Sequence, residues 1–311
     1  MSERPAGAPG AGTLTVLAVA WLLAMLGSAQ RALGDAPETD PLAVVRAALE
    51  LPQVVSASLV AGVAVGLATG NLLARLAPIA GTGAGVRFGT GTGAGLLAGL
   101  AVAVPIRLAY PGLPSVLAVS AAVAGAAGLG GLLSAVRHRR VLAAAVAGAL
   151  GGFAVGLAER AFEGDLRHLL GGGESARSVL TATGWLVLTG SLLAGVVAGA
   201  AGYAYLRRTG PRWPAYLVAG AAPGLLALLA EVITRLGGAR LFQAVGAASA
   251  DDRAVLSFVE AARLNRALIV LFAGALVAVF LLGRTLRPAT ADPDPDPEPE
   301  PAGPDRSQAS S

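Results

Sequence analysis

The sequence predicts an all-α integral membrane protein, and three observations lead to that prediction. The 311 residues are 55% hydrophobic and only 14% charged, with a mean hydropathy of +0.68. A soluble domain carries about 25% charged residues, so this chain has too little polar surface to coat a globule. Eight apolar segments are each long enough to cross a bilayer core about 30 Å thick. Arginine-rich and mixed-charge connections alternate between those segments.

The predicted bundle therefore has about eight transmembrane helices. Each needs roughly 20 apolar residues at 1.5 Å per residue. They cover residues 13–33, 54–76, 89–108, 115–136, 141–162, 179–206, 214–236 and 267–286. Residues 1–12 then form a short N-terminal segment, residues 13–287 one polytopic domain, and residues 288–311 a separate tail. An alternative for the first segment is a cleaved signal peptide, because Gly27-Ser28-Ala29 resembles a small-x-small cleavage site.

The arginines predict the orientation. One set of connections carries ten arginines and no acid: Arg75, Arg87, Arg137, Arg139, Arg140, Arg207, Arg208, Arg212, Arg284 and Arg287. The opposite set mixes acids with arginine. Arginine-rich loops stay in the cytoplasm, so both termini are expected on the cytoplasmic side of the plasma membrane. The absence of lysine, with the abundance of Ala and Gly, is typical of a GC-rich bacterial genome.

Three segments outside the spans have a pattern of their own. Asp40 and Pro41 start a short surface helix that Pro52 is expected to end. A second helix is predicted to start at Ser249 to Asp252 and to run into the last span. The tail alternates acid and proline from Asp292 to Pro301, which predicts an extended, disordered chain. Docking of the acidic tail on a basic partner is the alternative.

Three stretches of the sequence resemble one another. Residues 93–108, 150–163 and 222–237 align on Gly95, Gly152 and Gly224, and each follows a small-residue helix that ends at an arginine. This predicts a two-helix hairpin repeated three times, with the first and last spans as a possible fourth pair. Such repeats would be parallel, related about an axis along the membrane normal.

Glycines four residues apart line one face of five predicted spans. They are Gly62-Gly66-Gly70, Gly91-Gly95-Gly99, Gly148-Gly152-Gly156, Gly195-Gly199 and Gly220-Gly224. Small residues let helix backbones approach closely in lipid. These faces predict a tight bundle, and they fit helices of the same chain, a second copy or another membrane protein equally well.

Ionisable residues within spans are the first candidates for function. They are Arg107, Glu159, Glu231 and Arg235, with Asn71 as the clearest polar residue near the opposite end of a span. Glu159 and Glu231 are candidate proton or cation acceptors, and Arg107 a candidate anion contact. The alternatives are side chains that reach the lipid headgroups and i,i+4 pairs such as Glu231–Arg235.

Other kinds of site lack the residues they need. The chain has no cysteine and two histidines, His138 and His168, which predicts no metal site and no cofactor. Residues 81–95 are rich in glycine but lack the Gly-Lys-Ser/Thr ending of a phosphate-binding loop. The scattered arginines follow membrane topology rather than a nucleic-acid surface. With no catalytic motif, the chain is not expected to be an enzyme.

The sequence leaves three functional hypotheses, the third of which, a membrane-embedded enzyme acting on lipid, has the least support because nothing resembles a nucleophile or a metal site. The first is a non-catalytic membrane subunit or interaction protein, favoured by the glycine faces and the acidic tail. The second is a permease for a small solute or ion, favoured by the repeat, the helix prolines Pro105 and Pro223, and the charges near one end of the spans. A permease needs Glu159 or Glu231 to face the bundle interior, whereas a scaffold does not.

Overall fold

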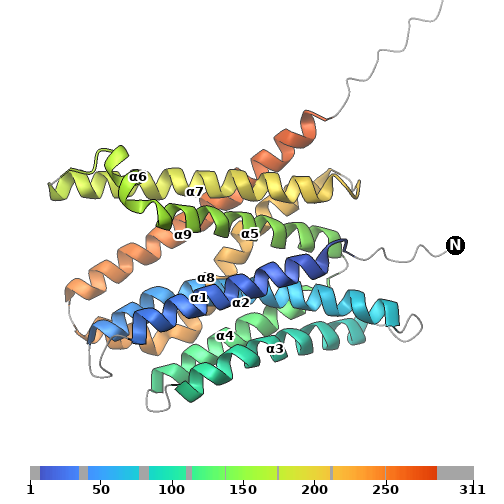
Figure 1. The fold of residues 1–311 in the computed structure, drawn as a ribbon, viewed down its shortest axis with the longest axis horizontal. Coiled ribbons are helices and arrows are strands. Elements are labelled where there is room, and N and C mark those ends of the chain that lie inside the picture. Colours follow the sequence, from blue (N-terminus) through green and yellow to red (C-terminus); the bar gives the residue numbers. More distant parts are fainter. Residues whose placement is uncertain are drawn as a thin grey trace, which may run out of the picture.

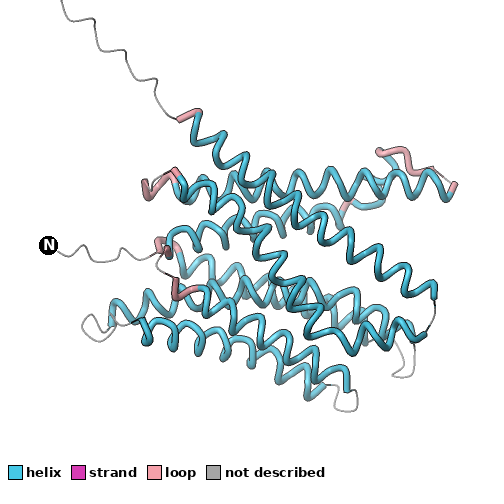
Figure 2. The backbone as a smooth tube through the Cα atoms, turned by 180° about the vertical axis from the view of Figure 1, so that it is seen from behind, coloured by secondary structure: helices cyan, strands magenta, loops and turns pink. Residues whose placement is uncertain are grey.

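The computed structural model describes residues 8–34, 41–76, 84–109, 114–136, 138–173, 175–210, 213–248 and 250–285. Within these residues the chain forms nine helices and no strand (Figures 1 and 2). The helices are α1 (Ala11–Gly34), α2 (Pro41–Leu76), α3 (Ala84–Ala109), α4 (Pro114–Leu133), α5 (Arg139–Ala161), α6 (Glu163–Leu169), α7 (Ala176–Leu206), α8 (Pro214–Ala248) and α9 (Ala250–Gly283).

The predicted membrane bundle is confirmed. In the described part of the chain, eight helices are long and apolar enough to cross a membrane, and the short α6 is not among them. We call the end with Arg75, Arg87, Arg139 and Arg207 the arginine-rich end, and the opposite end, with Glu159, Asp165 and Glu260, the mixed-charge end. Helix α1 begins and α9 ends at the arginine-rich end (Figure 1).

Three helices extend well beyond their predicted spans: α2, α8, which continues from the predicted end at residue 236 to Ala248, and α9. The expected break at Pro52 is wrong, because α2 continues through this residue from Pro41 to Leu76. A proline inside a helix removes one backbone hydrogen bond and favours a kink but does not always end the helix. The predicted run from the acidic segment near residue 250 into the last span is confirmed as α9. The predicted tail, residues 288–311, lies outside the described residues.

The helices group into two halves. The N-half comprises α1 to α4, in which α2 packs on all three other helices and α3 packs on α4. The C-half comprises α5 to α9, in which α7 and α8 both pack on α5 and on α9. Contacts between the halves run mainly through α8, which lies against α2 and α4, with smaller contacts from α5 to α1 and α2. Each half begins at the arginine-rich end and returns there after four spans.

Glycine contacts repeat between the two halves. In the N-half, Gly66 of α2 and Gly91 of α3 both pack on the backbone of α4 at Gly131. In the C-half, Gly199 of α7 and Gly220 of α8 both pack on the backbone of α9 at Gly274. In both halves, therefore, the second and third spans hold the fourth between two glycine faces. This matching arrangement indicates two parallel four-helix units.

The packing does not follow the predicted hairpin unit. Helices α4 and α5 form the second hairpin in sequence, yet they belong to different halves and are not an extensively packed pair. Gly95 and Gly224 do occupy matching places, because each packs its helix against the fourth span of its half. Gly152, the third aligned glycine, lies on α5, which opens the C-half. The period in the structure is therefore four spans rather than two.

Candidate functional site

A cavity of about 410 Å³ lies where the two halves meet. Its walls come from α1 and α2 of the N-half and from α5 to α9 of the C-half, with α6 contributing Glu163. The deepest lining residues on α5 and α8 are Ala149 and Pro223. Ala149 is ten residues into α5, about 15 Å from the arginine-rich end at 1.5 Å per residue. The cavity extends from there to the exposed side chains of Arg160 and Glu163, so it opens at the mixed-charge end.

Each wall is a stripe of residues at helical spacing. Helix α2 contributes Gln53, Ser56 and Val60, and α5 contributes Ala149, Gly152, Phe153, Gly156 and Glu159. Residues three, four and seven apart share a helix face. On α5 the small residues lie deep in the bundle and the charged ones near its mouth. The polar groups are therefore concentrated at one end of an apolar space.

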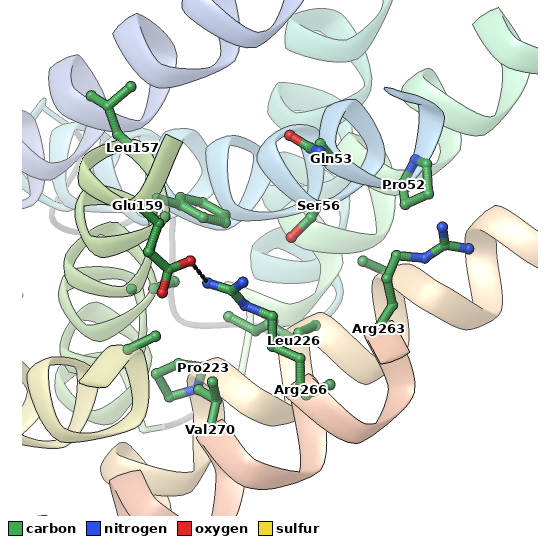
Figure 3. Close-up of a pocket in the computed structure, with 18 of the residues that line it drawn as sticks. Pro52, Gln53, Ser56, Leu157, Glu159, Pro223, Leu226, Arg263, Arg266 and Val270 are labelled. Carbon is green, nitrogen blue, oxygen red and sulfur yellow. Dashed lines mark hydrogen bonds and ion pairs between the residues drawn. The ribbon is translucent and has the colours of Figure 1, made fainter. Parts of the chain in front are cut away.

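Glu159 is held across the cavity by α9. Arg266 donates a hydrogen bond from Nη2 to Glu159 Oε2 at 3.0 Å, and Figure 3 shows the arginine reaching across to the carboxylate. Among the described residues Glu159 Oε1 has no hydrogen-bond partner. That oxygen lies against Gly190 of α7, at the place where a Cβ would be. The carboxylate is thus enclosed by α5, α7 and α9 and only half satisfied.

Glu231 forms a second ion-pair cluster. Its side chain is 7% exposed and accepts from Arg263 Nε at 3.1 Å and from Arg235 Nε at 3.2 Å. Arg235 Nη2 also lies 4.0 Å from Glu260 Oε2. Glu231 therefore shows both predicted features, since it makes the i,i+4 pair and faces the bundle interior. A buried carboxylate needs such partners, because leaving it unpaired costs several kcal/mol.

The apolar part of the cavity is built on an aromatic pair. Trp21 of α1 and Phe153 of α5 stack in parallel, with ring centroids 5.1 Å apart. Both rings line the cavity, together with Met25 and Leu226. Aromatic stacking across α1 and α5 also joins the two halves. The site therefore combines a flat apolar surface with charged groups at its mouth.

Three of the five predicted site residues are not part of the cavity wall. Arg107 is in the last turn of α3, a helix that does not line the cavity. Arg235 contacts the cavity only through Glu231. Asn71 is at the arginine-rich end, where its Nδ2 donates to the Ala8 carbonyl at 2.9 Å. Of the predicted candidates, Glu159 and Glu231 therefore meet at this space, and Arg107 does not join them.

Two central residues were missed by the sequence analysis. Arg263 and Arg266 precede the predicted last span and were not considered as candidates. The face that packs in the bundle could have revealed Arg263: from Gly274 it runs back through Val270 and Ala267 to Arg263 at helical spacing. Extending that stripe by one turn brings an arginine into the bundle interior.

The arginine-rich end is closed between the halves. Tyr205 of α7 donates its hydroxyl hydrogen to the Pro9 carbonyl, which precedes α1. The guanidinium of Arg139 on α5 lies over Gly70 of α2. Between this end and the cavity, a hydrophobic core joins α1, α2 and α5. The cavity thus has one open end and one closed end.

Within the described residues, no group of three or more His, Asp or Glu side chains could hold a metal ion. No family model matches the sequence, and the chain shows no significant similarity to a curated protein or to a solved structure. The geometry of the cavity is therefore the main evidence for the function.

Proposed function

We propose that this polytopic membrane protein is a permease for a small solute and that the cavity is its binding site. The observation that carries the proposal is the convergence of Glu159 and Glu231 on one space between two parallel four-helix halves. Ionisable side chains inside a membrane bundle are costly and are characteristic of solute pathways. Transporters built from parallel repeats bind their substrates at the repeat interface.

The shape of the cavity supports alternating access. Its open end is the mixed-charge end, which the arginine distribution predicts to face the outside of the cell. Its closed end, predicted to face the cytoplasm, is held by contacts between the halves, such as that from Tyr205 to Pro9. Rocking one half against the other about α8 exchanges the open and closed ends. Pro223 of α8 and Pro52 of α2, which both line the cavity, are places where these helices can bend.

The alternative, a non-catalytic membrane subunit, has less support. In the sequence it is favoured by the acidic tail and by glycine faces that fit a second protein as well as helices of the same chain. Gly62, Gly95, Gly199 and Gly220 pack instead on helices of the same chain. The acidic tail lies outside the described residues.

A test of the permease needs no knowledge of the solute. The chain has no cysteine, so Ser56→Cys places a single thiol in the cavity wall. A membrane-impermeant maleimide is applied to intact cells and, separately, to inside-out vesicles. A permease exposes Ser56→Cys to both sides in turn, so both preparations should be labelled. Labelling from one side alone would contradict alternating access and favour a subunit with a fixed cavity.

Three control variants define the sides of the membrane. Leu169→Cys, in the exposed end of α6, should be labelled only in intact cells. Leu76→Cys, in the exposed end of α2, should be labelled only in inside-out vesicles. Val123→Cys is fully buried in α4 and should stay unlabelled in both. In the Ser56→Cys background, Glu159→Gln or Glu231→Gln should change the ratio of the two labelling rates if the ion pairs control the exchange.

A further inference from the structure

The arginines that line the cavity leave hydrogen-bond donors unused, and this surplus of donors indicates the charge of the ligand. Three arginines line the space: Arg160, Arg263 and Arg266. Each guanidinium carries five N–H donors and no acceptor. Arg160 donates to Gln53, and Arg266 donates only to Glu159 among the described residues. Arg263 uses Nε and Nη2 on Glu231, while its buried Nη1 has no partner in that part of the chain.

Each acid of the site already has an arginine partner, although Glu159 Oε1, buried against Gly190, accepts no hydrogen bond among the described residues. Glu159 pairs with Arg266, Glu163 with Arg167, and Glu231 with Arg263 and Arg235. The residues that line the cavity include three glutamates and three arginines, so their charges balance. Arg160 has a neutral partner, Gln53, and no acid partner among the described residues. The surplus is therefore one of hydrogen-bond donors, because the guanidinium groups of Arg160, Arg263 and Arg266 keep N–H groups that no described carboxylate uses. A cationic ligand would have to break an existing ion pair, whereas an anion would complete the unused donors.

We propose that the cavity binds an amphipathic organic anion. Its carboxylate or phosphate group accepts hydrogen bonds from Arg263 and Arg266 at the mouth, where the planar guanidinium matches these anions. Its apolar body lies deeper, on the stacked rings of Trp21 and Phe153. The cavity of about 410 Å³ is within the range that encloses drug-sized molecules. The inference names the ligand class of the proposed permease site and rests on that proposal only in using the same cavity.

Trp21 provides a direct readout. The chain has three tryptophans, and Trp185 and Trp213 are exposed and do not line the cavity. The full-length W185F/W213F protein in non-ionic detergent therefore reports from Trp21 alone. Three probes share one brominated ring, which quenches tryptophan on contact: 4-bromophenylacetate, 4-bromophenethylammonium and 4-bromophenylacetamide. We expect saturable quenching by the acetate and no saturable quenching by the other two.

Two variants test the assigned donors. Arg263→Gln, and the double variant Arg266→Gln/Glu159→Gln, should each raise the acetate concentration at half-maximal quenching about tenfold, the loss expected for one charged hydrogen bond. The double variant removes both members of the ion pair, so no charge is left unpaired and the fold is preserved. Arg284→Gln, at the exposed arginine-rich end, should leave the acetate curve unchanged.

The outcomes separate this inference from the permease itself. Saturable quenching by the ammonium or amide probe to the same extent overturns the anion, while the cavity remains a solute site. Linear quenching by all three probes overturns the anion and also counts against the cavity as a solute site. For the source of the anion, the same protein is placed in bilayers of acyl-brominated phosphatidylglycerol or phosphatidylcholine. Excess quenching by phosphatidylglycerol that phenylacetate relieves assigns the site to a lipid headgroup, and equal quenching assigns it to a soluble anion.

Discussion

The carboxylate of Glu159 on α5 takes up the space that a side chain at position 190 of α7 would need. A Cβ built on Gly190 overlaps Glu159 Oε1, whereas Oε2 of the same carboxylate accepts from Arg266. Glycine at position 190 therefore allows α7 to pack directly against the Glu159 carboxylate, which Arg266 of α9 binds through its other oxygen. The position of the glutamate and the absence of a side chain at 190 depend on each other.

Gly190→Ala should displace Glu159 and destabilise the protein. Overpacking a filled interior costs about 1–3 kcal/mol, so the thermal unfolding temperature in detergent should fall. In a Glu159→Ala/Arg266→Gln background, which has no carboxylate to overlap and no arginine left unpaired, Gly190→Ala should cost much less. Gly184→Ala is the matched control on α7, because a Cβ there meets nothing within 4 Å. Equal stability of the two glycine variants would show that Glu159 does not occupy this place.

Glu231 and Arg263 should depend on each other more strongly than an exposed ion pair does. The Glu231 side chain is 7% exposed and that of Arg263 is 21% exposed. Removing one member of a buried pair costs about 3–5 kcal/mol, because the other charge is left behind. Glu231→Gln should therefore lower the unfolding temperature clearly, and much less so when Arg263→Gln is already present.

The comparison is with an exposed pair of the same chemistry. Glu163 and Arg167 on α6 are about half and two-fifths exposed, and such pairs contribute about 0–1 kcal/mol. Glu163→Gln should leave the unfolding temperature almost unchanged. A double-mutant cycle on each pair measures the coupling directly. Similar coupling in both would mean that Glu231 is hydrated in the protein.

The sequence predicted the bundle well because lipid imposes a simple rule. A span needs a long apolar run whose backbone hydrogen bonds form within the helix, and such runs can be recognised in the sequence. The candidates Glu159 and Glu231 also emerged, because a glutamate inside an apolar run is conspicuous. Their partners Arg263 and Arg266 did not, since they come before the most apolar part of α9 and resemble a loop.

The grouping into halves was not predictable from composition. Sequences rich in Ala, Gly and Leu align with one another at many offsets, so Gly152 of α5 matched Gly95 and Gly224 without sharing their place. Which glycine faces which helix is decided by three-dimensional packing among eight similar helices. Only the backbone contacts of Gly131 and Gly274 reveal that α4 and α9 are equivalent.

Gly274 and Gly131 should therefore be sensitive positions in their respective halves. A Cβ on Gly274 overlaps the Gly220 carbonyl, and one on Gly131 overlaps the Gly91 carbonyl. Backbone cannot move aside as a flexible side chain can, so either alanine should separate two helices and cost about 1–3 kcal/mol. The unfolding temperatures of Gly274→Ala and Gly131→Ala should both fall.

Each of these variants has a control on its own helix. Gly283→Ala on α9 and Gly125→Ala on α4 place a Cβ where nothing lies within 4 Å. Alanine is the better helix former by about 1 kcal/mol in a soluble helix, so the controls should be neutral or slightly stabilising. A lower unfolding temperature for only one of Gly274→Ala and Gly131→Ala would contradict the equivalence of the two halves.

Tyr205 should stabilise the closed arginine-rich end. Its hydroxyl donates to the Pro9 carbonyl and so ties α7 of the C-half to the segment before α1. A hydrogen bond of this kind contributes about 0.5–1.5 kcal/mol, and Tyr205→Phe removes it while keeping the ring. In the Ser56→Cys background, the rate of maleimide labelling in inside-out vesicles should rise about two- to tenfold, because the state open to the cytoplasm becomes more populated. Labelling of intact cells should fall or stay constant.

Thr181→Val removes a hydroxyl from the exposed other end of α7, where it bonds only within its own helix, and should change neither rate. Unchanged labelling of the Tyr205→Phe variant would mean that the hydrophobic core alone closes this end, and the hydroxyl would then have no part in gating.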